Sequence, residues 1–136
     1  TYRAANCLWK NDRHTMALFF QNRASEVFGI DIHPAANIAG AVMMDHATGI
    51  VIGQTCNIES EVSIFQGVTL GGTGSDSGKR HPDVKKGATI YASSTILGNI
   101  EIGEGSTIAA GSLVLKSVKP GITVAGIPAK ELTNSN

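Results

Sequence analysis

Aliphatic residues recur along most of this chain at intervals of six positions. The members of this series are Ile32, Ile38, Met44, Ile52, Ile58, Ile64, Leu70, Val84, Ile90, Ile96, Ile102, Ile108 and Val114. Small or β-branched residues follow most of them by four positions: Ala36, Val42, Cys56, Val62, Val68, Ala88, Ser94, Ser106 and Ser112. A period of six is neither the 3.6 of an amphipathic helix nor the two of a simple strand. It is typical of a solenoid whose flat sides are short strands.

Each hexad is expected to supply one strand and one corner, so that three hexads close a triangular coil of about 18 residues. The aliphatic side chains point inward, and equivalent residues of successive coils stack about 4.8 Å apart. Glycines such as Gly53 and Gly103 are expected to relieve the corners. The series predicts about four coils within a β-helix domain over residues 30–132.

Residues 2–28 follow a different pattern, in which apolar side chains recur at threes and fours as on one face of a helix. Gly29 is a plausible stop. We expect this helical segment, residues 1–29, to cover the open first coil, whose strand edges would otherwise be unpaired. Residues 133–136, after Pro128 and the last polar positions, are expected to form a loose tail.

The repeat is interrupted twice. Between Met44 and Ile52 the step is eight, with the sequence Asp45-His46-Ala47-Thr48-Gly49, and between Leu70 and Val84 it is fourteen. The second insert, residues 71–83, is polar and rich in glycine, so it is predicted to protrude as a loop. Both interruptions contain a histidine, and such breaks in a regular array are where we expect function.

Composition narrows the possible functions. The chain has 136 residues and a formal net charge of zero, so no overall field attracts nucleic acid or an anionic membrane. Sixteen glycines against 5% aromatic residues fit a narrow aliphatic solenoid. Cys7 and Cys56 have no disulfide or metal-site spacing, which favours a reducing compartment and hence a cytoplasmic protein. The chain has neither a signal-peptide pattern nor an initiator Met, which suggests a fragment of a longer chain.

Each candidate functional residue has a purely structural interpretation as well as a functional one. His46 is either a surface histidine or a general base oriented by Asp31 or Asp45. The run Gly71-Gly72-Thr73-Gly74 is either a flexible loop or a segment whose backbone N–H groups approach a ligand. Arg80 is either solvated or a bidentate clamp for a carboxylate.

Several segments together carry a family resemblance: Asp31-Ile32-His33-Pro34-Ala35-Ala36, Asp45-His46-Ala47-Thr48-Gly49, Val68-Thr69-Leu70-Gly71-Gly72-Thr73-Gly74, Arg80-His81-Pro82, Ile96-Leu97-Gly98-Asn99 and Ala125-Gly126-Ile127-Pro128-Ala129. They resemble the serine O-acetyltransferase family of hexapeptide-repeat acyltransferases over residues 2–132. The resemblance implies a mainly β fold, a left-handed parallel β-helix. It also implies acetyl transfer from acetyl-CoA to the hydroxyl of L-serine, which gives O-acetyl-L-serine and CoA in cysteine biosynthesis.

The same resemblance assigns roles to residues. His46 would be the general base and Asp31 would hold its imidazole, while Asp45, Arg80 and His81 would bind the amino acid. The residues expected to contact acetyl-CoA are Gly71, Gly72, Thr73, Ala92, Ala110 and Lys130. No metal is expected. Tyr91 stands where the family usually has a glycine, beside Ala92, so the coenzyme groove is expected to be reshaped there.

The family also implies a homotrimer in which one site uses His46 and His81 from different chains, and a hexamer when the full N-terminal domain is present. Cysteine is a possible feedback inhibitor. Three alternatives stay open. They are a hexapeptide acetyltransferase for a sugar or xenobiotic hydroxyl, a β-helical zinc enzyme, which would need three convergent imidazoles, and a non-catalytic trimerisation module.

Overall fold

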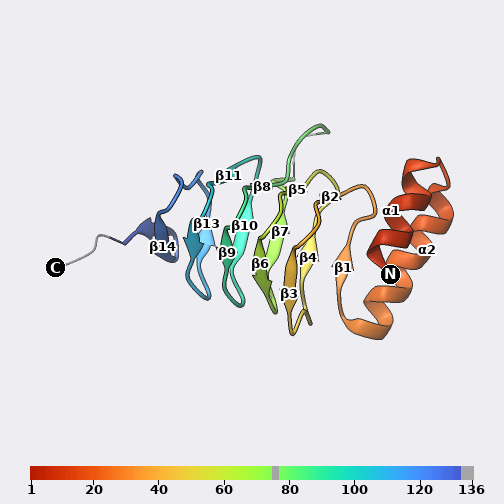
Figure 1. The fold of residues 1–136 in the computed structure, drawn as a ribbon, viewed down its shortest axis with the longest axis horizontal. Helices are drawn as coiled ribbons and strands as arrows, with labels where there is room; N and C mark the ends of the chain where they lie inside the picture. The colour runs from red at the N-terminus through yellow and green to blue at the C-terminus, as the bar shows by residue number, and fades with distance from the viewer. Residues whose placement is uncertain (75–76, 133–136) are drawn as a thin grey trace.

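The protein is an elongated stack of coils with two helices across one end, as a computed structural model shows (Figure 1). The structure describes residues 1–74 and 77–132. The predicted loose tail at 133–136 and the middle of the predicted 71–83 loop therefore lie outside the described residues. On either side of that gap, the chain between β7 and β8 projects from the stack (green in Figure 1).

Three parallel sheets form the sides of the stack, and their strands alternate along the chain. Sheet A contains β1 (Asp31–Ile32), β4 (Val51–Ile52), β7 (Thr69–Gly71), β10 (Thr95–Leu97) and β13 (Leu113–Val114). Sheet B contains β2 (Asn37–Ile38), β5 (Asn57–Ile58), β8 (Asp83–Val84) and β11 (Glu101–Ile102). Sheet C contains β3 (Met43–Asp45), β6 (Ser63–Phe65), β9 (Thr89–Ile90), β12 (Thr107–Ile108), β14 (Thr123–Gly126) and β15 (Ala129–Glu131). The predicted parallel β-helix is confirmed; among the strands of the described residues, only β15 pairs antiparallel, with β14.

The six-residue series forms the core. Register pairs join equivalent hexads, such as Ile52 with Leu70 and Ile64 with Ile90. From Ile52 to Ile108 the inward side chains are almost fully buried. Uniform aliphatic side chains therefore stack between coils as predicted.

The prediction of about four coils is too low, because the five strands of sheet A begin five coils. Val118 and Val124 supply the last inward positions; Val118 bridges to Ile102, and Val124 pairs with Ile108. The step from Val114 to Val118 is only four residues, so the six-residue period ends at Val114, one coil before the β-helix does.

Serines at inward corner positions are satisfied within the coil. The hydroxyl of Ser106 donates to the carbonyl of Gly103 at 2.7 Å, and that of Ser112 donates to the carbonyl of Ala109 at 2.6 Å. A buried hydroxyl is tolerated when it finds such a partner, which explains why serine alternates with alanine and valine at this position.

The predicted helical segment is confirmed and consists of two helices, α1 (Tyr2–Lys10) and α2 (His14–Phe28). The chain turns at Asp12, which has a φ of 58°, a conformation that Asp tolerates better than most residues. Gly29 ends α2 with a φ of 65°, as predicted. Within the described residues, neither helix is long and apolar enough to cross a membrane.

Helix α1 covers the open edge of the first coil with polar side chains. The amide of Asn6 donates to the carbonyl of Pro34 at 2.8 Å, Tyr2 donates to the carbonyl of Ala36, and Arg3 donates to that of Ile38. These carbonyls lie in or just before β2, the terminal strand of sheet B. The predicted capping of the exposed strand edge therefore takes place through side-chain donors.

Candidate active site

The loop between β7 and β8 folds back onto the corner between β4 and β5. Its last residues, Lys79, Arg80 and His81, pack on Gly53, Gln54 and Thr55 of the preceding coil. We call Gly53-Gln54-Thr55 the cradle. Two predicted substrate residues, Arg80 and His81, are thus fixed side by side at one corner.

Gly53 provides the room for the imidazole. A Cβ atom added to Gly53 would lie 1.9 Å from Cδ2 of His81 and 2.1 Å from its Nε2. The φ of Gly53 is outside the left-handed region, so this glycine is required for close approach and not, as predicted, to relieve a corner. Gly103 serves similarly, because a Cβ there would meet the backbone of Pro120 at 2.5 Å.

Gln54 holds the guanidinium of Arg80. Its Oε1 accepts a hydrogen bond from Nη2 at 2.9 Å, while Nη1 donates to the carbonyl of Gly78 at 3.3 Å. Lys79 donates to the carbonyl of Thr55 at 2.5 Å and to Asp83 at 2.7 Å. Both acceptors of the Arg80 guanidinium within residues 1–74 and 77–132 are neutral, so they leave its positive charge uncompensated and able to bind an anionic ligand.

Electrostatics favour a neutral His81. The residue is only 8% exposed, and burial lowers the pKa of its imidazole; the positive charges of Arg80 and Lys79 and the nearby His33 act in the same direction. His33, which packs edge-on against Trp9 with ring centroids 5.0 Å apart, also has a lowered pKa, chiefly because of burial. A neutral imidazole can donate a hydrogen bond to a ligand through its protonated nitrogen or accept one at its other nitrogen.

His46 lies at a different corner, between β3 and β4, in an unusual backbone conformation. His46 and Ala47 have φ values of 57° and 64°, and the N–H of Ala47 donates to the carbonyl of Asp45 at 2.6 Å. Such tight turns with positive φ are rare and strained for residues other than glycine, and they cluster at functional sites. The His46 side chain is 73% exposed, so this corner presents an accessible imidazole.

The carboxylate nearest to His46 is that of Asp45, whose Oδ2 lies 3.7 Å from Nε2. Asp31, predicted to hold the imidazole, instead accepts a hydrogen bond from the side-chain amide of Gln21 at 2.6 Å. Within residues 1–74 and 77–132 there is no hydrogen bond or ion pair between Asp31 and His46. The structure thus ties Asp31 to helix α2, and its role toward His46 stays a prediction.

The predicted coenzyme residues fall into two groups. Ala92 and Ala110 follow β9 and β12, so they occupy the same corner as His46 in later coils; we call this column the C–A edge. The second group lies at the end of β7, of which Gly71 is the last residue and after which Gly72 and Thr73 follow. We call this column of corners, which also contains the cradle, the A–B edge. A Cβ on Gly72 would come within 3.2 Å of Arg80 and His81.

Lys130 lies on the last strand of sheet C, one strand beyond β14, which itself pairs with β12 just before Ala110. It is on β15 and pairs with Ala125 at the C-terminal end of sheet C. Tyr91, beside Ala92, is 43% exposed and stacks on Phe65 with ring centroids 5.1 Å apart. The surface next to Ala92 is therefore aromatic, and the predicted reshaping of the coenzyme groove stays a prediction.

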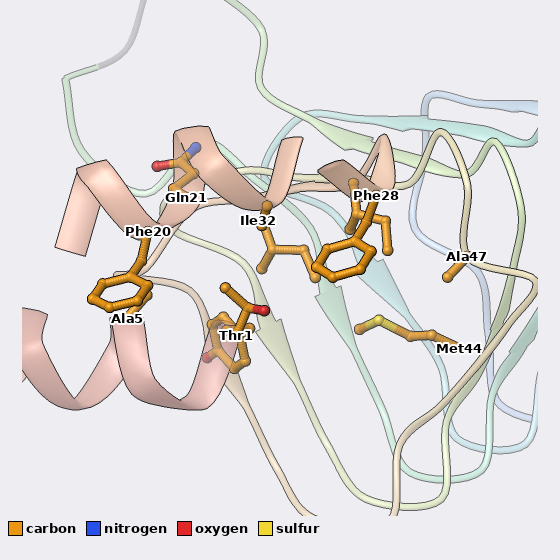
Figure 2. A pocket seen from close by; sticks show the side chains of 11 residues that line it. Thr1, Ala5, Phe20, Gln21, Phe28, Ile32, Met44 and Ala47 are labelled. Carbon is orange, nitrogen blue, oxygen red and sulfur yellow. The ribbon is translucent and has the colours of Figure 1, made fainter. Parts of the chain in front are cut away.

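An apolar cavity of about 220 Å³ lies between the helices and the first coil (Figure 2). Figure 2 shows Phe28, Ile32 and Met44 gathered around it, and Gln21 also lines it. Arg80 and His81 are not among its lining residues. Its walls offer no charged side chain, so it is unsuited to an amino acid. Among the described residues, no cluster of three or more His, Cys, Asp or Glu side chains is arranged to hold a metal ion.

Comparisons with known proteins identify the family to which this fold belongs. The family described as "Bacterial transferase hexapeptide (six repeats)" matches residues 81–116. The serine acetyltransferase of Buchnera aphidicola subsp. Schizaphis graminum is 53% identical over 139 aligned residues, which include 99% of this chain. The chain is a homologue of the serine acetyltransferases. It spans about half the length of this relative, namely 53%.

Solved serine acetyltransferases share the fold. The enzyme of Brucella abortus in complex with coenzyme A superposes with a TM-score of 0.95 at 51% identity, covering 96% of this chain and 52% of that one. The Neisseria gonorrhoeae serine acetyltransferase in complex with serine gives a TM-score of 0.94 at 49% identity, covering 97% of this chain and 54% of that one.

Sequence patterns alone did not reveal the cradle of this serine acetyltransferase homologue. Gly53, Gln54 and Thr55 continue the six-residue repeat without interruption, and their partners Arg80 and His81 come 25 to 28 positions later. The one available signal was the glycine directly after an inward isoleucine. That signal is weak, because Gly71 and Gly103 occupy the same position in other coils.

Proposed function

We propose that this chain catalyses acetyl transfer from acetyl-CoA to the hydroxyl of L-serine, giving O-acetyl-L-serine and CoA. The observation that carries the proposal is the fixed Arg80–His81 pair, seated on the cradle, where the guanidinium of Arg80 meets neutral acceptors among the described residues. A guanidinium of this kind suits the carboxylate of an amino acid. The similarity to proteins solved with coenzyme A and with serine supports the same reaction.

In the proposed reaction His46 is the general base. Its imidazole removes the proton from the serine hydroxyl as the oxygen attacks the thioester carbon, and the tetrahedral intermediate then loses CoA. The C–O bond forms, the C–S bond breaks, and the proton passes from the imidazole to the departing sulfur. Asp31 would orient His46, and Asp45 would bind the ammonium group of serine.

Backbone N–H groups are proposed to bind acetyl-CoA at Gly71, Gly72 and Thr73 on one side and at Ala92 and Ala110 on the other. Lys130 would meet a phosphate of the coenzyme. Ala92 and Ala110 share the C–A edge with His46, which supports a coenzyme lying along that edge with its thioester toward the base.

The separation of the two edges supports a site between subunits. His46 lies at the corner where the strands of sheet A begin, and the Arg80–His81 pair lies at the corner where they end. About five extended residues, or roughly 16 Å at 3.3 Å per residue, separate the two corners. One serine molecule cannot bridge that distance. In a homotrimer the C–A edge of one chain would face the A–B edge of the next, so each site would combine the two groups.

A thiol-release assay with acetyl-CoA tests the proposal. Serine should release CoA at a rate well above background, while sugar and xenobiotic alcohols should not. Turnover with a sugar or xenobiotic alcohol but not with serine would support the broader acyltransferase alternative. No turnover with any acceptor, together with a trimeric native mass, would support the trimerisation module.

A further inference from the structure

Thr55, in the cradle, contacts the loop through every polar atom that it has. Its backbone N–H donates to Nδ1 of His81 at 3.2 Å, and its carbonyl accepts from Lys79 at 2.5 Å. Its hydroxyl oxygen Oγ1 accepts from the backbone N–H of Arg80 and from that of His81, each at 3.1 Å. The same oxygen lies 2.8 Å from Nδ1 of His81.

The proton count at the hydroxyl follows from these contacts. A threonine hydroxyl has one proton to donate and two lone pairs to accept with. The backbone N–H groups of Arg80 and His81 occupy both lone pairs, so the proton must point at Nδ1. Nδ1 therefore receives two donors, the hydroxyl and the backbone N–H of Thr55.

A ring nitrogen that receives hydrogen bonds carries no proton, so the single proton of neutral His81 lies on Nε2. Within residues 1–74 and 77–132, no group bonds to Nε2 of His81, and this nitrogen lies against Gly53 and Gly72. The ring can thus present an N–H donor to a ligand from a fixed position.

We propose that Thr55 is a positioning residue, which fixes His81 as its Nε2–H tautomer and holds the Arg80–His81 backbone in place for an anionic or carbonyl-bearing substrate. The part that concerns serine rests on the proposed function. The tautomer is a property of the free protein and stands independently of it.

The test compares Thr55→Val with Thr55→Ser. Valine keeps the shape but lacks the hydroxyl, leaving two loop N–H groups without an acceptor, whereas serine keeps the hydroxyl. Thr107→Val is a matched control, because Thr107 lies on β12 in sheet C, away from the cradle, and its hydroxyl has no hydrogen bond among the described residues.

Long-range 1H–15N NMR on the full chain measures the tautomer, with His81→Gln used to identify the His81 signals. The unsubstituted protein, Thr55→Ser and Thr107→Val should show protonated Nε2 and bare Nδ1. Thr55→Val keeps the backbone N–H donor to Nδ1 but loses the hydroxyl donor, so the Nε2–H form should still dominate while the Nδ1–H population rises measurably above that of Thr55→Ser and Thr107→Val. The pKa of its His81 should move toward the ordinary histidine value, because one of the two donors that favour the neutral ring is gone.

In steady-state kinetics Thr55→Val should raise KM for serine about tenfold, with a smaller change in kcat, and Thr55→Ser should restore it. A protonated Nδ1 in the unsubstituted protein would overturn the proposal, even if Thr55→Val failed to fold. An unchanged His81 spectrum in folded Thr55→Val would also overturn it. A shifted tautomer without serine turnover in any variant would retain Thr55 as the positioning residue and refute only the proposed function.

Discussion

Replacing Gly53 by alanine should displace His81 while leaving the coil intact. The new Cβ would lie 1.9 Å from Cδ2, 2.1 Å from Nε2 and 2.7 Å from Cγ of the ring. Carbon atoms settle at about 3.5 to 4.0 Å, so the ring must move by roughly 1.5 Å. The contacts of Nδ1 with Thr55, now 2.8 and 3.2 Å, would then be stretched beyond hydrogen-bonding range.

A misplacement of this size in a substrate-binding group can reduce a rate by about a hundredfold. We therefore expect kcat/KM for serine, measured by thiol release, to fall about a hundredfold in Gly53→Ala. Gly40→Ala is the matched control, since a Cβ there meets no atom within 4 Å and Gly40 has no left-handed φ. Wild-type kcat/KM in folded Gly53→Ala would refute the role of the seated imidazole.

Two further predictions concern the same corner. Gln54→Glu should raise KM for serine several-fold, because a carboxylate 2.9 Å from the Arg80 guanidinium would compete with the substrate carboxylate; an unchanged KM would contradict this. Burial raises the pKa of the Cys56 thiol to about 12, above its unfolded value near 8.5. Its contribution to stability is therefore complete below about pH 8.5 and is lost as the pH rises toward 12. The free energy of unfolding, measured with urea, should therefore fall more over this pH range for the wild type than for Cys56→Ala. Parallel curves of this free energy against pH would contradict the expectation.

The interior of the β-helix could be predicted because each hexad specifies its own strand and corner. Ile52, Ile64 and Ile90 are buried at the positions that the period assigns. The prediction failed where the local rule changed, at the four-residue step to Val118. The helical segment was predicted, but its division at Asp12, a residue with positive φ, was not indicated by the pattern of threes and fours.

The site was predictable only in its motif residues. His46, Arg80 and His81 interrupt the repeat and match a family pattern, whereas Gly53 and Thr55 look like ordinary corner residues. Their importance comes from contacts with His81, 26 to 28 positions later, which no local period encodes. The structure also shows Asp31 bound to Gln21, a contact that the sequence pattern did not indicate.

Mixing two inactive variants tests the central claim, a serine site shared between subunits, most directly. His46→Ala lacks the base on one edge, and Arg80→Ala lacks the carboxylate clamp on the other. When they are co-assembled in equal amounts, about one quarter of the interfaces in a cyclic assembly regain both groups. We predict that thiol release with serine returns to about a quarter of the wild-type rate. Activity that stays at the level of the separate variants, in assemblies shown to be mixed, would contradict the account.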